Sequence, residues 1–184
     1  MATLSYIANT SVDGYIADAD GNIDWTPPSQ DVFAFFTELV RPIGTYLYGR
    51  RLYDAMAVWE MLDAPPDFPG QLDFARLWRA AEKVVYSTTL ETPSTARTRI
   101  ERAFDPADVR RLVETSERNV TVGGAQLAGQ AIGAGLVDEI HLMILPYLLG
   151  GGSQALPDGV RRGLKLLEQH TFDNGSVYVR YGMA

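Results

Sequence analysis

The chain has 184 residues, 46% of them hydrophobic and 21% charged, which fits one folded domain over residues 1–184 with a substantial apolar core. Lys and Arg number 16 against 23 Asp and Glu, and the net charge of −7 argues against a nucleic-acid or anionic-membrane partner. The lack of cysteine excludes disulfides and thiolate zinc sites, and with only His141 and His170 no metal is expected.

The first residues lack a basic segment followed by a long apolar one, and no apolar stretch is long enough to cross a bilayer. The sequence therefore predicts a cytoplasmic protein.

The first half of the chain reads as strands alternating with helices. Ser29 is placed as the N-cap of a helix over 31–40, whose apolar residues recur at helical spacing. A loop is expected over 63–70, which holds three prolines. The expected strands are 3–9, extending into 15–16, then 45–48 and 83–87, and the other expected helices are 50–58 and 72–80.

The second half continues the alternation and ends in a hairpin. Asp105 as N-cap and Pro106 as the first helical residue predict a helix over 106–117, whereas the arginine-rich segment 97–102 receives no assignment. The remaining expected elements are a strand over 119–122, a helix over 124–134 ending at Gly135, a strand over 139–145, and a hairpin of 164–171 and 176–181 around an Asn-Gly turn. This order predicts a mostly parallel sheet with an antiparallel edge.

The strongest chemical signal is a strand that runs through Gly123 and Gly124 directly into a helix. A helix start offers free backbone N–H groups and a partial positive charge, and glycines let a phosphate approach them. A tight turn without any ligand explains the pattern equally well.

A second strand–glycine–helix junction follows at Gly49, now with Arg50 and Arg51 at the helix start. Cations oppose the helix dipole there, so a nearby anion would account for them, and the guanidinium fork suits phosphate. The alternative is two solvated arginines, one of them paired with Asp54.

Taken together, these segments resemble the dihydrofolate reductase superfamily. The likeness is closer to the reductase domain of bacterial riboflavin-biosynthesis deaminase/reductases and its stand-alone relatives. No single piece is specific, but the matching pieces run in family order over nearly the whole chain. They are residues 9–16, 20–25, 48–53, 83–87, 122–127, 135–142 and 146–152.

The resemblance implies a three-layer αβα fold, dihydrofolate-reductase-like, that binds NADPH. The cofactor contacts that it implies are Ala8, Asn9, Ile16, Gly21, Trp25, Gly49, Arg50, Arg51, Ser87, Thr88, Gly123, Gly124, Gln126 and Leu127. The chain departs from dihydrofolate reductases at Leu52, where they carry a threonine, so one phosphate hydrogen bond is expected to be missing. It also lacks the ligands of a zinc deaminase domain, so only the reductase half is expected.

Asp31 is the first candidate for a substrate-facing acid, because the matching helix of folate reductases carries a substrate-binding carboxylate. Its alternative role is a helix-start carboxylate stabilised by the dipole. Asp13 and Asp24 are turn residues or acids of the first loop. Glu60 either faces the pocket or is solvated, and Gly150–Gly152 either approaches a ligand or forms a flexible turn.

The first functional hypothesis is an NADPH-dependent reductase of a small heterocycle, of the 5-amino-6-(5-phosphoribosylamino)uracil reductase type. Such a substrate needs a second phosphate site, for which only Arg97, Arg99 and Arg102 are available. The alternatives are a dihydrofolate reductase and a non-catalytic NADPH-binding protein. A homodimer is also expected, joined through an edge strand or an apolar strand surface, with Tyr147, Leu148, Leu149 and Tyr178 as the candidate residues.

Overall fold

The structure of the protein is a computed structural model, and it describes residues 1–23, 25, 29–62 and 70–184. Asp24 and nearly all of the proline-rich loop lie outside the described residues. The strands are β1 Leu4–Ser11, β2 Tyr15–Ala17, β3 Ile43–Gly49, β4 Glu82–Tyr86, β5 Thr98–Glu101, β6 Asn119–Gly123, β7 Glu139–Leu145, β8 Ser153–Gln154, β9 Leu164–Thr171 and β10 Val177–Met183. The helices are α1 Gln30–Val40, α2 Arg50–Met56, the 3-10 helix η1 Ala57–Glu60, α3 Gly70–Ala80, α4 Pro106–Thr115 and α5 Ala125–Gly133.

The main sheet has eight strands in the order β5-β4-β3-β6-β1-β7-β10-β9. The six strands from β5 to β7 pair in parallel, while β10 pairs antiparallel with both β7 and β9. The fold predicted from the sequence, a mostly parallel sheet with an antiparallel C-terminal hairpin, is confirmed. A separate short sheet joins β2 to β8.

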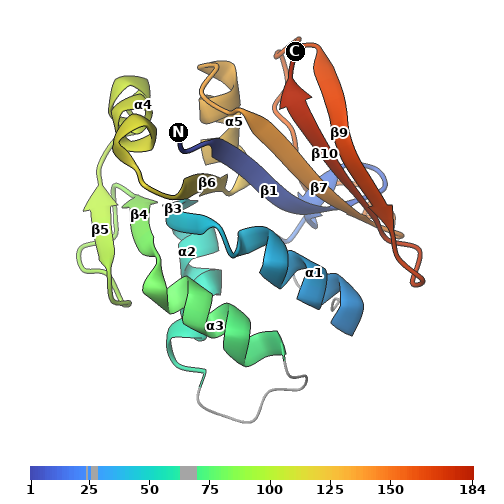
Figure 1. The fold of residues 1–184 in the computed structure, drawn as a ribbon, viewed down its shortest axis with the longest axis horizontal. Coiled ribbons are helices and arrows are strands. Elements are labelled where there is room, and N and C mark those ends of the chain that lie inside the picture. Colours follow the sequence, from blue (N-terminus) through green and yellow to red (C-terminus); the bar gives the residue numbers. More distant parts are fainter. Residues whose placement is uncertain (24, 26–28, 63–69) are drawn as a thin grey trace.

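Helices cover both faces of the sheet and create two main cores (Figure 1). On one face, α4 and α5 pack against residues such as Leu47 and Val122. On the other face, α1, α2 and α3 pack against residues such as Tyr48 and Val85. Successive residues of one strand therefore serve opposite cores, as Leu47 and Tyr48 of β3 do, because side chains alternate across a strand. The layered αβα architecture follows from this alternation.

Several local expectations need correction. Segment 97–102 contains β5, a short strand that pairs with β4 and that its charged side chains concealed. The helix expected over 50–58 divides into α2 and η1. Ser29 does occupy the N-cap position of α1, but its hydroxyl makes no cap hydrogen bond and instead accepts one from Asn174 of the hairpin turn at 3.0 Å. By contrast, Asp105 caps α4 as predicted, accepting a hydrogen bond from the Ala107 N–H.

Tyr178 also lies elsewhere than expected. It is 1% exposed and packs among Val32, Met143 and Leu145 under α1, with its ring edge-on to Phe35. A side chain buried inside its own chain is not available to a second copy, so the expected interface role of Tyr178 is wrong.

Candidate functional site

The carboxyl ends of β1, β3 and β6 lie side by side in the sheet, because β3 and β1 flank β6 and run parallel to it. From β1 the chain crosses to β3 on one side, whereas from β6 it crosses over β1 to β7 on the other. Strand order reverses at this point, and in open α/β sheets such a reversal leaves a crevice where ligands bind. Two of the strand ends here, Gly49 and Gly123, are glycines that the sequence singled out.

The β6–α5 turn needs both of its glycines for structural reasons. A Cβ on Gly123 would lie 2.5 Å from Leu52 Cδ2 and 3.3 Å from the Tyr48 ring, so α2 packs against bare backbone. Gly124 has φ +88°, a conformation that side chains disfavour. Leu52 occupies this space as a packing residue, which accounts for the hydrophobic side chain where a threonine was expected.

The two glycine-led helix starts adjoin each other. A Cβ on Gly124 would lie 3.9 Å from the backbone nitrogen of Gly49, and nothing nearer obstructs it. Gly49 is the N-cap of α2 and Gly124 that of α5, and neither helix start has a side-chain cap. The first N–H groups of both helices therefore lack side-chain acceptors, and both dipoles direct partial positive charge into the same region.

The two arginines of α2 have different surroundings. Arg50 Nε donates to Asp54 Oδ2 at 2.6 Å, one turn along the helix, as one alternative predicted. Arg51 is exposed, and no ion pair is recorded for it within the described part of the chain. It lines a hollow of about 610 Å³ together with Gly21, Gly152 and Ser153. Arg51 is thus the cation that faces open space.

The first loop and the loop after β7 form the opposite wall of this hollow. Asp18 and Gly21 line it from one loop, and Gly152 reaches it because β8 pairs with β2. Gly152 has φ +128°, and a Cβ there would lie 2.0 Å from the Ala17 carbonyl oxygen. Gly152 is therefore packed against β2 and lines the hollow, whereas a Cβ on Gly150 or Gly151 would have no atom within 4 Å.

Asp13 holds the loop after β7 in place. Its carboxylate accepts hydrogen bonds from the backbone N–H of Leu149 at 3.1 Å and of Gly150 at 2.7 Å, and from the Ser11 hydroxyl at 2.6 Å. The Ser11 and Gly150 hydrogen bonds lower the pKa of Asp13 below its usual 3.8. The turn role proposed for Asp13 is correct, but the distant loop that it fixes was not visible in the sequence.

The central strand β1 carries the next two predicted residues. Asn9 is exposed even though β1 has a strand on each side, so its face of the sheet is open at that point. Ala8 is half-buried and packs toward the α5 side. Ile16 and Trp25, two further predicted residues, contact each other, since the indole N–H of Trp25 donates to the Ile16 carbonyl at 3.3 Å.

The helix α5 divides its two predicted residues between solvent and core. Gln126 is exposed at the first turn, beside the glycine turn. The Leu127 side chain is 5% exposed and belongs to the core under α5, so only its backbone faces the helix start.

Ser87 and Thr88 at the end of β4 differ in the same way. The Ser87 hydroxyl is buried and accepts hydrogen bonds from the N–H groups of Thr89 at 3.2 Å and Leu90 at 3.0 Å, which stabilises a turn. Arg102 closes that turn by donating to the carbonyls of Ser87 and Leu90. Thr88 is exposed, so it alone of this pair presents a side chain to solvent.

The two acid candidates lie on different elements, Asp31 in the first turn of α1 and Glu60 at the end of η1. Asp31 is exposed at the start of α1, where the Ser29 hydroxyl and, more weakly, His170 lower its pKa. Glu60 neither faces the crevice nor is fully solvated. One of its oxygens accepts a hydrogen bond from the Ala96 N–H at 3.3 Å, and the other is buried without a hydrogen-bond partner among the described residues.

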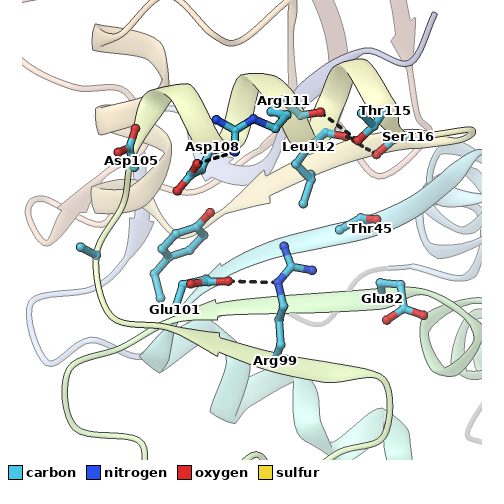
Figure 2. A pocket seen from close by; sticks show the side chains of 12 residues that line it. Thr45, Glu82, Arg99, Glu101, Asp105, Asp108, Arg111, Leu112, Thr115 and Ser116 are labelled. Atoms are coloured by element: carbon cyan, nitrogen blue, oxygen red, sulfur yellow. Dashed lines mark hydrogen bonds and ion pairs between the residues drawn. The ribbon is translucent and has the colours of Figure 1, made fainter.

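A second hollow, of about 430 Å³, lies between α4 and the strands β4 and β5 (Figure 2). Figure 2 shows two ion pairs among its charged side chains: Arg99 donates to Glu101 and Arg111 to Asp108. Arg99 lines the hollow, but none of the residues predicted to contact the cofactor does. Arg97 pairs with Glu82, one of the residues that line the hollow. Arg97, Arg99 and Arg102 are each engaged by protein groups and do not assemble into a phosphate site.

The described residues contain no group of three or more His, Cys, Asp or Glu side chains placed to hold a metal ion. Among the helices that the structure describes, none has the length and apolar character needed to traverse a bilayer.

Comparisons with known proteins decide the family. A sequence model of the RibD C-terminal domain family matches residues 2–178. The chain belongs to the RibD C-terminal domain family. This confirms the resemblance to the reductase domain that the ordered segments indicated.

Individual relatives agree with this family. The chain is 30% identical over 174 residues to the protein YyaP of Bacillus subtilis (strain 168), covering 93% of this chain and 89% of that one. A solved structure from Shewanella sp. PV-4, whose name places it in riboflavin biosynthesis, has a TM-score of 0.76 at 19% identity over 100% of this chain and 99% of that one. A deaminase/reductase from Thermotoga maritima has a TM-score of 0.67 at 16% identity, over 100% of this chain and 57% of that protein. These two structural likenesses show the fold.

Proposed function

We propose that this protein is an NADPH-dependent reductase of a small heterocycle of pyrimidine or pterin type. The observation that carries the proposal is the juxtaposition of two helix starts without side-chain caps, at Gly49 and Gly124. Beside them lies Arg51, for which no ion pair exists among the described residues. A pyrophosphate fits this chemistry, because it brings negative charge to free N–H groups and positive dipole ends. Membership of the RibD C-terminal domain family supports a reductase.

The chain's own groups would bind and orient the cofactor, which supplies a hydride when it is bound. In this proposal the backbone N–H groups at the starts of α2 and α5 hold the pyrophosphate, with Gln126 at its edge. Arg51 and Thr88 hold the 2′-phosphate. Asn9 and Ala8 meet the nicotinamide on the open part of β1. Trp25, Ile16, Gly21 and the loop Gly150–Gly152 close the opposite wall and exclude water.

The substrate class is the second part of the proposal. Similar solved structures include a pyrimidine reductase-like protein from Corynebacterium diphtheriae, with a TM-score of 0.68 at 16% identity over 100% of this chain and 92% of that one. The Thermotoga protein is named in part as a 5-amino-6-(5-phosphoribosylamino)uracil reductase. A phosphate on such a substrate would need partners other than Arg97, Arg99 and Arg102, which are engaged elsewhere. A cytoplasmic location stays a prediction of the sequence.

Titration with NADPH and NADH, followed by tryptophan fluorescence, tests the nucleotide site. We expect Arg51→Ala to weaken NADPH binding roughly tenfold or more, with little effect on NADH, because the lost contact is to the 2′-phosphate. Arg50→Ala is the matched control: Arg50 precedes Arg51 on the same helix, but Asp54 already engages its guanidinium. Equal losses in both variants would contradict the assignment to Arg51, and binding of neither nucleotide would overturn the proposal.

Turnover then separates an enzyme from a binder. Oxidation of bound NADPH by a member of a pyrimidine and pterin panel supports the reductase. Stoichiometric binding without oxidation by any of them supports the non-catalytic NADPH-binding alternative, and oxidation by dihydrofolate alone supports a dihydrofolate reductase.

A further inference from the structure

Most of the chain around the candidate site carries no cation. Residues 1–40, which include β1, the first loop and α1, contain no Lys or Arg. Neither do residues 119–160, which include β6, α5, β7 and β8 with the loops between them. The first of these two stretches carries six carboxylates, on Asp13, Asp18, Asp20, Asp24, Asp31 and Glu38. A phosphate bound between these elements would therefore need a cation from another part of the chain or free backbone N–H groups.

The helix α2 supplies the cation that reaches the hollow. Arg51 is the only Lys or Arg among the described residues that line it, and Asp18 and Asp20 line it too. Under the proposed function, Arg51 holds the 2′-phosphate of NADPH, and the N–H groups of the helix starts at Gly49 and Gly124 hold its pyrophosphate. The phosphates of the cofactor thus use the anion-binding groups identified at this crevice.

The other cations are engaged by protein groups or lie elsewhere. Lys165 is placed at the opposite end of the sheet, because its partner Gly182 also pairs with Glu139, the first residue of β7. Arg162 reaches Gly135, beyond the end of α5 that lies away from Gly124. Arg76 and Arg110 are exposed on α3 and α4, and neither lines the hollow. Those that pair with carboxylates or donate to carbonyls are Arg41, Arg50, Arg79, Lys83, Arg97, Arg99, Arg102, Arg111, Arg118 and Arg180.

An exposed apolar group, here called the outer wall, adjoins Trp25 and consists of Val12, Tyr147 and Leu148. The Tyr147 ring lies edge-on to Trp25, with 5.8 Å between the centroids, and the Tyr147 carbonyl accepts a hydrogen bond from the Val12 N–H at 2.9 Å. Val12 is 62% exposed, Tyr147 47% and Leu148 75%. Single exposed apolar side chains are ordinary, but a group of them beside a pocket indicates a contact surface.

We propose that the substrate carries no phosphate and places an uncharged apolar or aromatic substituent against the outer wall. This inference rests on the proposed function, because it assigns Arg51 and the helix starts to the cofactor. A phosphorylated substrate would bring negative charge to a site whose remaining charged lining, Asp18 and Asp20, is acidic. An apolar substituent would instead remove the exposed surfaces of Val12, Tyr147 and Leu148 from water. The substrate would then differ from the phosphoribosyl compound in the name of the Thermotoga protein.

Three matched probes test the substituent. They are 5-amino-6-(5-phosphoribosylamino)uracil, the same compound without its phosphate, and 5-amino-6-(benzylamino)uracil. Calorimetric titration into protein saturated with NADP⁺ measures binding without hydride transfer. We expect the benzylamino probe to bind roughly tenfold or more tightly than the phosphorylated probe, with the dephosphorylated probe between them. Tightest binding of the phosphorylated probe would overturn the inference, as would failure of both uncharged probes to bind at millimolar concentration.

Variants of the outer wall locate the contact. Leu148→Arg adds a cation there and should improve binding of the phosphorylated probe roughly fivefold. Leu164→Arg is the matched control: Leu164 is also an exposed leucine, 41% exposed, but it lies on β9 at the far end of the sheet, and its replacement should change nothing. Tyr147→Ala should weaken the benzylamino probe roughly fivefold, whereas Tyr147→Phe keeps the ring and should retain its affinity.

Two further readouts distinguish other uses of these residues. If Arg51→Ala removes binding of the phosphorylated probe while NADPH still binds, Arg51 serves the substrate and the inference fails. If Tyr147→Ala or Leu148→Arg lowers the mass measured by light scattering and leaves every probe affinity unchanged, the outer wall contacts a second copy of the chain and not the substrate.

The order of the measurements separates this inference from the proposed function. NADPH titration comes first, and a protein that binds no NADPH contradicts the proposed function. A protein that binds NADPH but prefers the phosphorylated probe keeps its function as a nucleotide-dependent reductase, and only the inference about its substrate is overturned.

Discussion

Leu52 of α2 packs directly on Gly123 at the end of β6, so closely that a Cβ on the glycine would lie 2.5 Å from Leu52 Cδ2. The contact brings the start of α2 against the β6–α5 turn and thereby sets the two helix starts beside each other. The same glycine was read from the sequence as a phosphate-binding residue. Its packing role is independent of any ligand and gives a direct prediction of stability.

Gly123→Ala should lower the free energy of unfolding by about 1–3 kcal/mol, the usual cost of overpacking a well-packed contact. Leu52→Ala removes the clashing methyl, so the double variant should be less destabilised than the sum of the two single changes. Urea titration of the four proteins measures the coupling. Gly133→Ala, at the end of α5 with nothing within 4 Å, is the matched control and should be neutral or stabilising by about 0.4–1 kcal/mol. Simple additivity would contradict the packing role.

Arg102 and Arg99 come from the same arginine-rich segment but differ in what they contact. Arg102 donates to the carbonyls of Ser87 at 2.9 Å and Leu90 at 2.7 Å, both residues being buried. Arg102→Ala should therefore cost about 1–2 kcal/mol of unfolding free energy, because the turn loses charge-assisted hydrogen bonds. Arg99→Ala removes only an exposed pair with Glu101 and should cost less than about 0.5 kcal/mol. Equal costs in urea titrations would show that the turn does not depend on Arg102.

Much of this fold could be predicted because local signals and the tertiary structure agree. A few neighbouring residues are enough to identify three of its elements: the cap at Asp105, the strand before Gly123 and the Asn-Gly turn of the hairpin. The strand β5 could not be found that way. Its residues Thr98–Glu101 carry two paired charges and almost no apolar alternation, and only pairing with β4 makes them a strand.

In the candidate site, too, some features have a local sequence signal and others depend on tertiary contacts. The two glycine-led junctions are visible in the sequence, and at the β6–α5 turn the backbone itself requires Gly123 and Gly124. The contact between Asp13 and Gly150 spans most of the chain and leaves no local signal. Likewise, Arg50 and Arg51 are adjacent in sequence, and only the helical spacing to Asp54 and the shape of the hollow distinguish the paired arginine from the open one.

His141 gives the protein a pH-dependent stability. It is 5% exposed, and burial lowers its pKa below the usual 6.5, against an opposing effect of Glu139. The neutral ring fits its neighbours: Nε2 donates to Glu139 at 3.1 Å, and Nδ1 accepts from the Tyr178 hydroxyl at 2.8 Å.

The unfolded chain therefore takes up a proton near pH 6.5, where the folded chain does not. The stabilisation that comes from burying neutral His141 is complete above that pH and is lost as the pH falls toward the lowered pKa. Urea titrations should show stability decreasing below pH 6.5, and His141→Gln should flatten that part of the profile. An unchanged slope in His141→Gln would assign the pH dependence to other groups.

Under the proposed function, Asp13 would affect nucleotide binding through the segment after β7 that it holds. Asp13→Asn keeps the size of the side chain but loses the negative charge that accepts from Leu149 and Gly150. The segment Gly150–Gly152 should then loosen where it lines the hollow with Arg51, and NADPH affinity should fall roughly threefold to tenfold. Hydrogen bonds lower the pKa of Asp13, so its charged form adds to the stability of the folded state. That stabilisation is present above the usual pKa of 3.8 and is lost only as the pH falls further. Hydrogen exchange at residues 149–152 measures the loosening directly. Weaker NADPH binding without faster exchange at these residues would mean that Asp13 acts on the nucleotide by another route.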